Sequence, residues 1–169
     1  MTRKTSTLRT KTPSNTDPFQ QALRLLTGRD HSEAELAAKL RRRGFAPAEV
    51  DEALRRCREY GYVDDRRYAV ARARSLMAEG RAVGHRLAAE LQRRGIDGET
   101  AAFATETVTE EIPLADLLEK VFCRRFSGFD FENADSRQLS RIVNYFFRRG
   151  FPIDAIMQLI REKGSQQEV

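Results

Sequence analysis

The fold of this chain is decided by a six-residue stretch that occurs three times. It reads Leu40-Arg41-Arg42-Arg43-Gly44-Phe45, then Leu91-Gln92-Arg93-Arg94-Gly95-Ile96, and then Phe146-Phe147-Arg148-Arg149-Gly150-Phe151. The residue after a helix often needs a positive φ, which suits glycine, and an arginine pair suits the carbonyl end of a helix. Each copy therefore predicts a helix that ends in a glycine turn, and three copies indicate a helical repeat protein.

Apolar residues flank each glycine at helical spacing. The positions four and eight before the glycine share one helical face, and the positions six and ten after it share another. They hold Leu40, Leu36, Val50 and Leu54 in the first copy, Leu91, Leu87, Ala101 and Thr105 in the second, and Phe146, Ile142, Ile156 and Ile160 in the third. Each repeat is therefore predicted to contain a helix, a glycine turn and a second helix, with a weaker stripe in the middle copy.

The composition favours an all-α protein. Ala, Leu, Arg and Glu dominate, which are helix formers, and no stretch alternates apolar and polar side chains as a strand would. A period of about 50 residues favours a row of small modules over one compact domain. We therefore expect an elongated body whose long surface suits docking along an extended partner, without a deep catalytic pocket.

Composition and helix signals divide the chain into five segments. Residues 1–16 are basic and nearly free of large apolar side chains, which predicts a disordered tail that could attract phosphates. Three three-helix repeats are expected at 17–63, 64–111 and 112–163, followed by a flexible tail at 164–169.

Helix starts are marked by capping residues and by proline. Ser32 and Glu35 have the spacing of a capping box, and Pro47 fits the first turn of a helix. Ser136 is expected to cap a later helix, and the last helix is expected over about 152–163.

Few residues carry a catalytic or metal-binding pattern. Cys57 and Cys123 each stand alone in a predicted helix and are expected to be packed or half-packed thiols, and His31 and His85 are isolated. The Asp64-Asp65 pair precedes a predicted helix, so it is interpreted as a cap, with metal chemistry as the alternative. No nucleophile elbow or phosphate loop occurs. We predict no enzymatic activity, no cofactor and no metal site.

The hydropathy pattern predicts a cytoplasmic protein. No apolar run approaches the roughly 18 residues that a membrane span needs. The first residues, 1–6, lack the apolar core of a secretion signal.

Charge is segregated along the chain. Residues 41–94 contain fourteen Arg and eight acids, whereas residues 95–119 contain seven acids and no base. A basic part can meet nucleic-acid phosphates, and an acidic part can meet a basic protein surface. A GC-rich genome would explain the preference for Arg over Lys, but it explains the acidic block less easily.

Eight arginines are candidates for contact with a partner. Glu90 can pair with Arg86 and Arg94 at four-residue spacing, which is a purely structural role. Arg67, Arg74 and Arg93 have no carboxylate at that spacing within the same predicted helix and are better candidates. The full set is Arg41, Arg42, Arg43, Arg67, Arg74, Arg86, Arg93 and Arg94.

The third repeat contains an inserted loop with three phenylalanines, over residues 126–131. Exposed aromatic rings there could stack on bases. We favour the alternative, in which they fill the core of the repeat.

Together these residues resemble the RecX family of regulatory proteins, which are bacterial modulators of the RecA recombinase. The resemblance runs from about Ala22 to Ile160, with Val63 where the family usually has Leu and Tyr68 where Phe is common. The matching residues are Ala22, Leu23, Leu26, Arg29, Ser32, Glu35, Leu36, Leu40, Arg43, Gly44 and Phe45, then Tyr62, Asp64, Asp65 and Ala69, then Gly84, Leu87, Glu90, Leu91, Gly95 and Ile96, and finally Arg148, Arg149, Gly150, Phe151 and Ile156.

The resemblance implies a curved array of three tandem three-helix repeats without enzymatic activity. It further implies binding to RecA filaments on single-stranded DNA, with inhibition of filament extension, ATPase and strand exchange. We expect a monomer that contacts single-stranded DNA, and duplex DNA more weakly, through phosphates. The eight arginines would supply most of this contact, and the acidic residues 97–119 would face basic recombinase surface.

The leading alternative is a general DNA-binding protein of the helix-turn-helix type. Base readout needs a helix whose outer face offers Arg, Asn or Gln without acids between them. We find no helix that does so cleanly, and therefore rank this alternative second.

Overall fold

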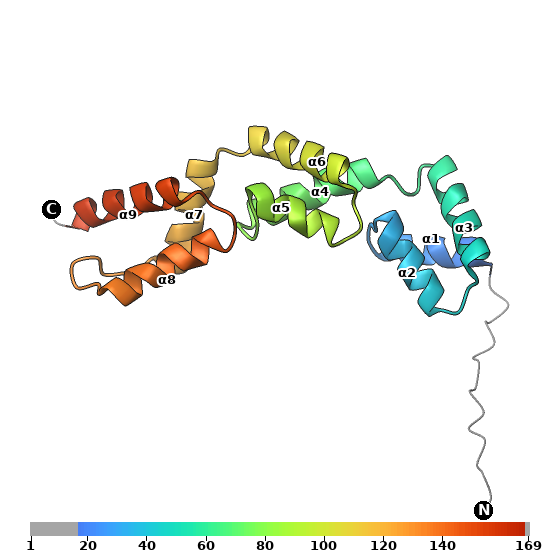
Figure 1. Ribbon diagram of the computed structural model, residues 1–169, viewed down its shortest axis with the longest axis horizontal. Coiled ribbons are helices and arrows are strands. Elements are labelled where there is room, and N and C mark those ends of the chain that lie inside the picture. Colours follow the sequence, from blue (N-terminus) through green and yellow to red (C-terminus); the bar gives the residue numbers. More distant parts are fainter. Residues whose placement is uncertain (1–16, 168–169) are drawn as a thin grey trace, which may run out of the picture. The chain divides into compact units, whose positions relative to one another are not determined.

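The computed structural model describes residues 17–167, and all regular secondary structure in that range is helical (Figure 1). The helices are α1 (Pro18–Gly28), α2 (Glu33–Arg42), α3 (Pro47–Glu59), α4 (Asp65–Ala78), α5 (Gly84–Gln92), α6 (Gly98–Glu111), α7 (Leu114–Phe126), α8 (Ser136–Phe147) and α9 (Ile153–Gln167). The chain forms two compact units, and the boundary between them in the sequence falls between Asp64 and Asp65. The all-α prediction is confirmed for the described residues, whereas the predicted tail at 1–16 lies outside them.

The first unit packs α1, α2 and α3 around a small apolar core. Its centre is made by the predicted stripe, because Leu36, Leu40 and Val50 are fully buried, and Cys57 joins them from the end of α3. The helix starts also follow the sequence signals. The Ser32 hydroxyl accepts a hydrogen bond of 3.1 Å from the N–H of Glu35, and Pro47 occupies the first turn of α3.

The second unit contains two helix triplets that share one continuous core. Helices α4, α5 and α6 pack on one another, and α9 packs on α7 and α8. The buried residues again include the predicted stripes, among them Leu87, Leu91, Phe146 and Ile156. Helices α4 to α6 and helices α7 to α9 thus form the two triplets of this unit.

The repeated glycine turn has the expected backbone in all three copies. Gly44, Gly95 and Gly150 have φ values of 93°, 83° and 93°. These angles lie in the region that side chains with a Cβ rarely adopt. The six-residue stretch therefore ends a helix in each copy for the predicted reason.

The two helix triplets of the second unit approach each other closely at two glycines, Gly150 and Gly80. A Cβ atom at Gly150 would lie 2.3 Å from the carbonyl oxygen of Val83, and a Cβ atom at Gly80 would lie 2.2 Å from Cγ2 of Val121. The Arg124 guanidinium also donates a hydrogen bond of 2.8 Å to the carbonyl of Glu79. This junction fixes the third helix triplet against the second.

Several details differ from the sequence-based expectations. Asp135, not Ser136, caps α8, because its carboxylate accepts the N–H of Gln138 at 2.7 Å while the Gln138 side chain accepts the N–H of Asp135. Helix α9 continues through Gln167 and so takes in residues expected in a flexible tail from 164. Lys163 is held there by Glu119 of α7 at 2.6 Å.

The inserted loop of the third repeat packs against the core. The rings of Phe129 and Phe131 meet edge to face at 4.7 Å, and Phe131 stacks on Phe122 at 5.9 Å. Phe126 contacts Tyr145 at 5.3 Å. This arrangement agrees with the core-filling interpretation of the loop.

Candidate nucleic-acid interface

The end of α2 presents three consecutive arginines to solvent. Arg41, Arg42 and Arg43 are all exposed, and they lie in the last turn of α2 and at its C-cap. The Arg43 guanidinium donates to the carbonyl of Lys39 at 3.2 Å. Within residues 17–167, Arg41 and Arg42 make no ion pair, so their guanidinium groups are available to an external anion.

Helix α3 of the same unit shows the opposite arrangement. Arg55 binds the carboxylates of both Glu52 and Glu59, with 2.6 Å to Glu52. Arg58 reaches across to Glu33 of α2 at 2.7 Å. The arginines of α3 are therefore used inside the unit, which separates them from those at the end of α2.

The arginines of α4 are partly neutralised by the acidic helix α6. Both nitrogens of the Arg74 fork bind the Glu111 carboxylate, at 2.7 and 2.8 Å. Hydrogen bonding to Arg74 lowers the pKa of Glu111, and the same contact raises the pKa of Arg74. The Arg66 guanidinium of α4 lies 3.7 Å from the ring centre of Phe103 on α6. Glu111 is 37 residues from Arg74 in the sequence, so spacing within one helix does not predict this pair.

The arginines of α5 and its end also find partners that four-residue spacing does not predict. Arg93 binds Glu90 at 2.5 Å, three positions away. Arg94 is half-buried, with its guanidinium 3.5 Å from the hydroxyl of Tyr68. Arg86 is exposed, and its side-chain stem lies against Gly150 of the next repeat.

Arg67 of α4 is exposed on the surface of the second unit. The eight predicted arginines thus fall into three groups: an exposed cluster at the end of α2, single exposed residues on α4 and α5, and residues engaged within the second unit. Arg41, Arg42 and Arg43 belong to the first unit, and the other five belong to the second.

A further basic face lies on α8, and the sequence analysis missed it. Helix α8 contains Arg137, Gln138, Arg141 and Asn144 with no acid between them, and Arg148 follows at its C-cap. The statement that no helix offers such a face was therefore wrong. The signal is the acid-free stretch itself, which shares this helix with the buried stripe of Ile142 and Phe146.

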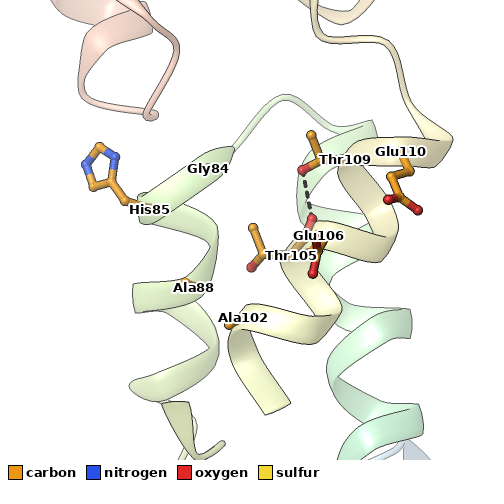
Figure 2. A pocket seen from close by; sticks show the side chains of 8 residues that line it. All are labelled: Gly84, His85, Ala88, Ala102, Thr105, Glu106, Thr109 and Glu110. Carbon is orange, nitrogen blue, oxygen red and sulfur yellow. Dashed lines mark hydrogen bonds between the residues drawn. The ribbon is translucent and has the colours of Figure 1, made fainter. Parts of the chain in front are cut away.

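A groove of about 610 Å³ lies between α5 and α6 in the second unit (Figure 2). Figure 2 shows Thr105 between the two helices, whereas Glu110 points away. The hydroxyls of Thr105 and Thr109 donate to carbonyls of α6 itself, at 2.8 and 2.7 Å. The groove is lined mostly by small side chains, and its hydroxyl donors are already used.

The titratable residues singled out from the sequence have structural surroundings. His31 is buried and lies 3.1 Å from the Glu35 carboxylate. The sequence-based expectation treated His31 as isolated, and the structure shows this neighbour. Burial lowers the pKa of His31, with the Glu35 hydrogen bond acting in the opposite direction. Cys57 is buried, which raises the pKa of its thiol, whereas Cys123 is exposed rather than packed. Among residues 17–167 no three His, Cys, Asp or Glu side chains are grouped as metal ligands would be.

Over the part of the chain that the structure covers, no helix combines the length and the apolar character that crossing a bilayer requires.

Comparison with known proteins identifies the family. Models of the first and second three-helix domains of RecX match residues 19–57 and 64–104. A regulatory protein RecX from Syntrophotalea carbinolica is 44% identical over 148 residues, which cover 88% of this chain and 97% of the relative. The chain belongs to the RecX family. A regulatory protein RecX from Trichlorobacter lovleyi is 39% identical over 150 residues, covering 86% and 95% of the two chains.

Solved RecX structures share the fold. The crystal structure of RecX from Lactobacillus salivarius superimposes with a TM-score of 0.67 at 20% identity, covering 88% of this chain and 95% of that one. A second regulatory RecX structure gives 0.70 at 19% identity, covering 86% and 70%. The family predicted from the residues is confirmed, and the chain is a regulatory protein of the RecX family.

Proposed function

We propose that this RecX protein binds RecA recombinase filaments on single-stranded DNA and restrains their extension, ATPase and strand exchange. The observation that carries the proposal is the 44% identity to a regulatory protein RecX over nearly the full length of that relative. Regulation of this kind needs no bond to be made or broken. It would act in the cytoplasm, in recombination and DNA repair, without a cofactor.

The electrostatic contact is proposed to come from the predicted arginines, which differ in how accessible their charges are. Arg41, Arg42 and Arg86 are exposed and offer the most accessible charges, and Arg43 and Arg67 are exposed as well. Arg74 and Arg93 would have to exchange Glu111 and Glu90 for a phosphate. Such an exchange costs little, because exposed ion pairs contribute weakly to stability. Arg94, half-buried near Tyr68, is the least accessible of the eight.

The acidic stretch 97–119 is proposed to face basic recombinase surface. Glu106 and Glu110 are exposed on α6, and Glu99 is exposed in its first turn. Glu111 is engaged with Arg74 and is therefore excluded from this role. Acidic and basic surfaces on one molecule would select a partner that presents both phosphates and basic side chains.

Repeated helix triplets suit a partner with a repeated surface. A filament presents equivalent sites on successive subunits, so a chain with repeats at 17–63, 64–111 and 112–163 can contact more than one of them. A monomer that bridges neighbouring subunits would hold the filament in a state that cannot complete its nucleotide cycle or add subunits. The proposal therefore requires binding to filaments in preference to free recombinase.

The test is co-sedimentation with RecA recombinase assembled on single-stranded DNA with a non-hydrolysed nucleotide. The protein should pellet with the filament and stay in the supernatant with recombinase alone. Equal recovery with free recombinase, or none with the filament, would refute the proposal. A filament of recombinase on DNA without added protein serves as the baseline.

The acid-free helix α8 favours a second candidate, a general DNA-binding protein that reads duplex DNA. This candidate predicts tight, sequence-selective binding to duplex DNA without any recombinase. A gel-shift titration over several duplex sequences, with and without recombinase, separates the two functions. Weak and sequence-independent duplex binding would support the regulator.

A further inference from the structure

Helix α8 has an exposed basic face directly opposite its buried stripe. At about 100° per residue, Arg137, Arg141, Asn144 and Arg148 fall within an arc of about 60°. Ile142 and Phe146 on the other side of the helix are fully buried. The four polar residues are all exposed. These four residues form the α8 face.

The α8 face is distinguished by its lack of internal neutralisation. Among the helices of residues 17–167, α8 alone contains more than one arginine and no acid. Two of the acids that precede the helix along the chain are used locally, because Asp135 caps the helix and Asp130 accepts the N–H groups of Glu132 and Asn133. Arg137, Arg141 and Arg148 make no ion pair in the described part of the chain. The face therefore has an uncompensated positive charge.

The C-terminal end of the α8 face is hollowed and pre-organised. A depression of about 330 Å³ is lined by Arg141, Asn144, Tyr145, Arg148 and Arg149. The Arg149 guanidinium lies 3.5 Å from the centre of the Tyr145 ring and donates to the Tyr145 carbonyl at 2.8 Å. A guanidinium held in this way loses little side-chain freedom when it binds an anion.

An exposed aromatic ring borders the same face. Phe147 is 55% exposed, although Phe146 beside it is fully buried. Phe147 lies next to Asn144 on the helix surface, because three-residue spacing makes the two neighbours. A flat ring beside several arginines suits a ligand that has both phosphates and unstacked bases.

We propose that the α8 face is a binding site for single-stranded nucleic acid. Arg137, Arg141 and Arg148 bind successive phosphates, and Phe147 stacks on a base. Duplex DNA fits less well because its bases are already stacked and would not reach Phe147. An acidic protein surface would use the arginines but would leave the ring without a purpose. The inference deepens the proposed function by placing its DNA contact in the third repeat, outside the eight predicted arginines.

The test measures binding of the full chain to fluorescent oligothymidylate by anisotropy, without recombinase, over a range of salt concentrations. The triple variant R137Q/R141Q/R148Q should bind at least tenfold more weakly at low salt. The salt slope, which is the steepness with which the logarithm of affinity falls against the logarithm of salt concentration, should decrease by about 2. Each phosphate contact contributes about 0.7 to this slope with single strands. The control R81Q/R125Q/R161Q removes the same charge elsewhere in the second unit and should keep most of the affinity.

Phe147 is tested separately from charge. F147A should weaken binding about fivefold or more, as expected for the loss of one base stack. M157A, which removes another exposed apolar side chain from the same unit, should bind as the parent does. Helical circular dichroism and melting temperature should be unchanged in all four variants, because the substituted side chains are exposed.

Three results would overturn the inference: equal weakening by both triple variants, unchanged binding by R137Q/R141Q/R148Q, or duplex DNA binding more tightly than the single strand. Co-sedimentation with filaments is scored separately. If R137Q/R141Q/R148Q binds oligothymidylate normally but loses the filament, α8 contacts an acidic protein surface and the inference fails. If the parent protein binds oligothymidylate through α8 but ignores filaments, the inference stands and the proposed function fails.

Discussion

The backbone N–H of Val83 donates a hydrogen bond of 2.8 Å to the carbonyl oxygen of Arg149. Val83 precedes α5, and Arg149 precedes the glycine of the third turn, so this bond joins two helix triplets of the second unit. It can form because Gly150 has no side chain at the point of closest approach. One copy of the repeated glycine turn thus both ends a helix and makes a contact between repeats.

We expect Gly150→Ala to destabilise the second unit strongly. The φ of 93° alone should cost about 1–2 kcal/mol for a residue with a Cβ atom. The new Cβ would also meet the Val83 carbonyl at 2.3 Å, and relieving such overpacking should cost a further ~1–3 kcal/mol. Urea unfolding followed by circular dichroism measures the loss.

Gly44→Ala is the matched control for that substitution. Gly44 has the same φ of 93°, but a Cβ atom there would have no neighbour within 4 Å. The control should therefore show only the conformational cost of about 1–2 kcal/mol. Equal losses of stability in the two variants would show that the contact with Val83 contributes nothing.

Replacing Glu111 with Gln should strengthen binding to single-stranded DNA. The substitution releases Arg74 from its bidentate ion pair and leaves one more arginine free to bind phosphate. If Arg74 contacts a phosphate, the salt slope should rise by about 0.7. The measurement is the same anisotropy titration over a range of salt, and the melting temperature should change little because the pair is exposed.

Glu106→Gln controls for the change in net charge. Glu106 is exposed on the same helix as Glu111 and has no ion-pair partner within residues 17–167. It should raise affinity less than Glu111→Gln does. An identical gain from both variants would mean that net charge, rather than the released Arg74, causes the effect.

The first unit should lose stability as the pH falls below about 6.5, the ordinary pKa of histidine. Burial lowers the pKa of His31 in the folded protein, so the unfolded state binds a proton more readily than the folded state does. His31 stabilisation is therefore complete above the unfolded pKa and declines on acidification until the folded pKa is passed. Thermal melting between pH 7 and 5 measures the slope of melting temperature against pH.

His31→Gln should reduce that slope, whereas His85→Gln should leave it unchanged, because His85 is exposed on α5. These are the two histidines of the chain, so the pair of variants isolates the buried one. A slope that survives His31→Gln would assign the acid sensitivity to carboxylates instead.

Local patterns predicted most of the fold because they act over one or two helical turns. The positions of Leu40, Leu91 and Phe146 follow from 3.6-residue periodicity, and the glycine turns follow from backbone sterics. Where two neighbours could serve equally, as with Asp135 and Ser136, the sequence did not distinguish the cap. Helix α9 continues past its expected end at 163, where Lys163 binds Glu119 in a contact across the fold that local patterns do not predict.

The site was harder to predict because charge pairing depends on tertiary structure. Glu111 is 37 residues from Arg74 in the sequence, and packing of α4 on α6 brings them together. Spacing rules within one helix could not find that pair. The α8 face was within reach of such rules, since Arg137, Arg141 and Arg148 share a helical face with no acid between them.

The central claim, that exposed arginines hold the protein on a recombinase filament, is tested most directly by DNA-dependent ATPase inhibition over a range of salt. R41Q/R42Q should raise the protein concentration needed for half inhibition and lower the salt slope by about 1.4 if both residues contact phosphate on single-stranded DNA. R55Q/R58Q loses the same charge from residues already paired within the first unit, and should change both quantities less. Unchanged potency and slope in R41Q/R42Q, or equal changes in the two variants, would contradict the account.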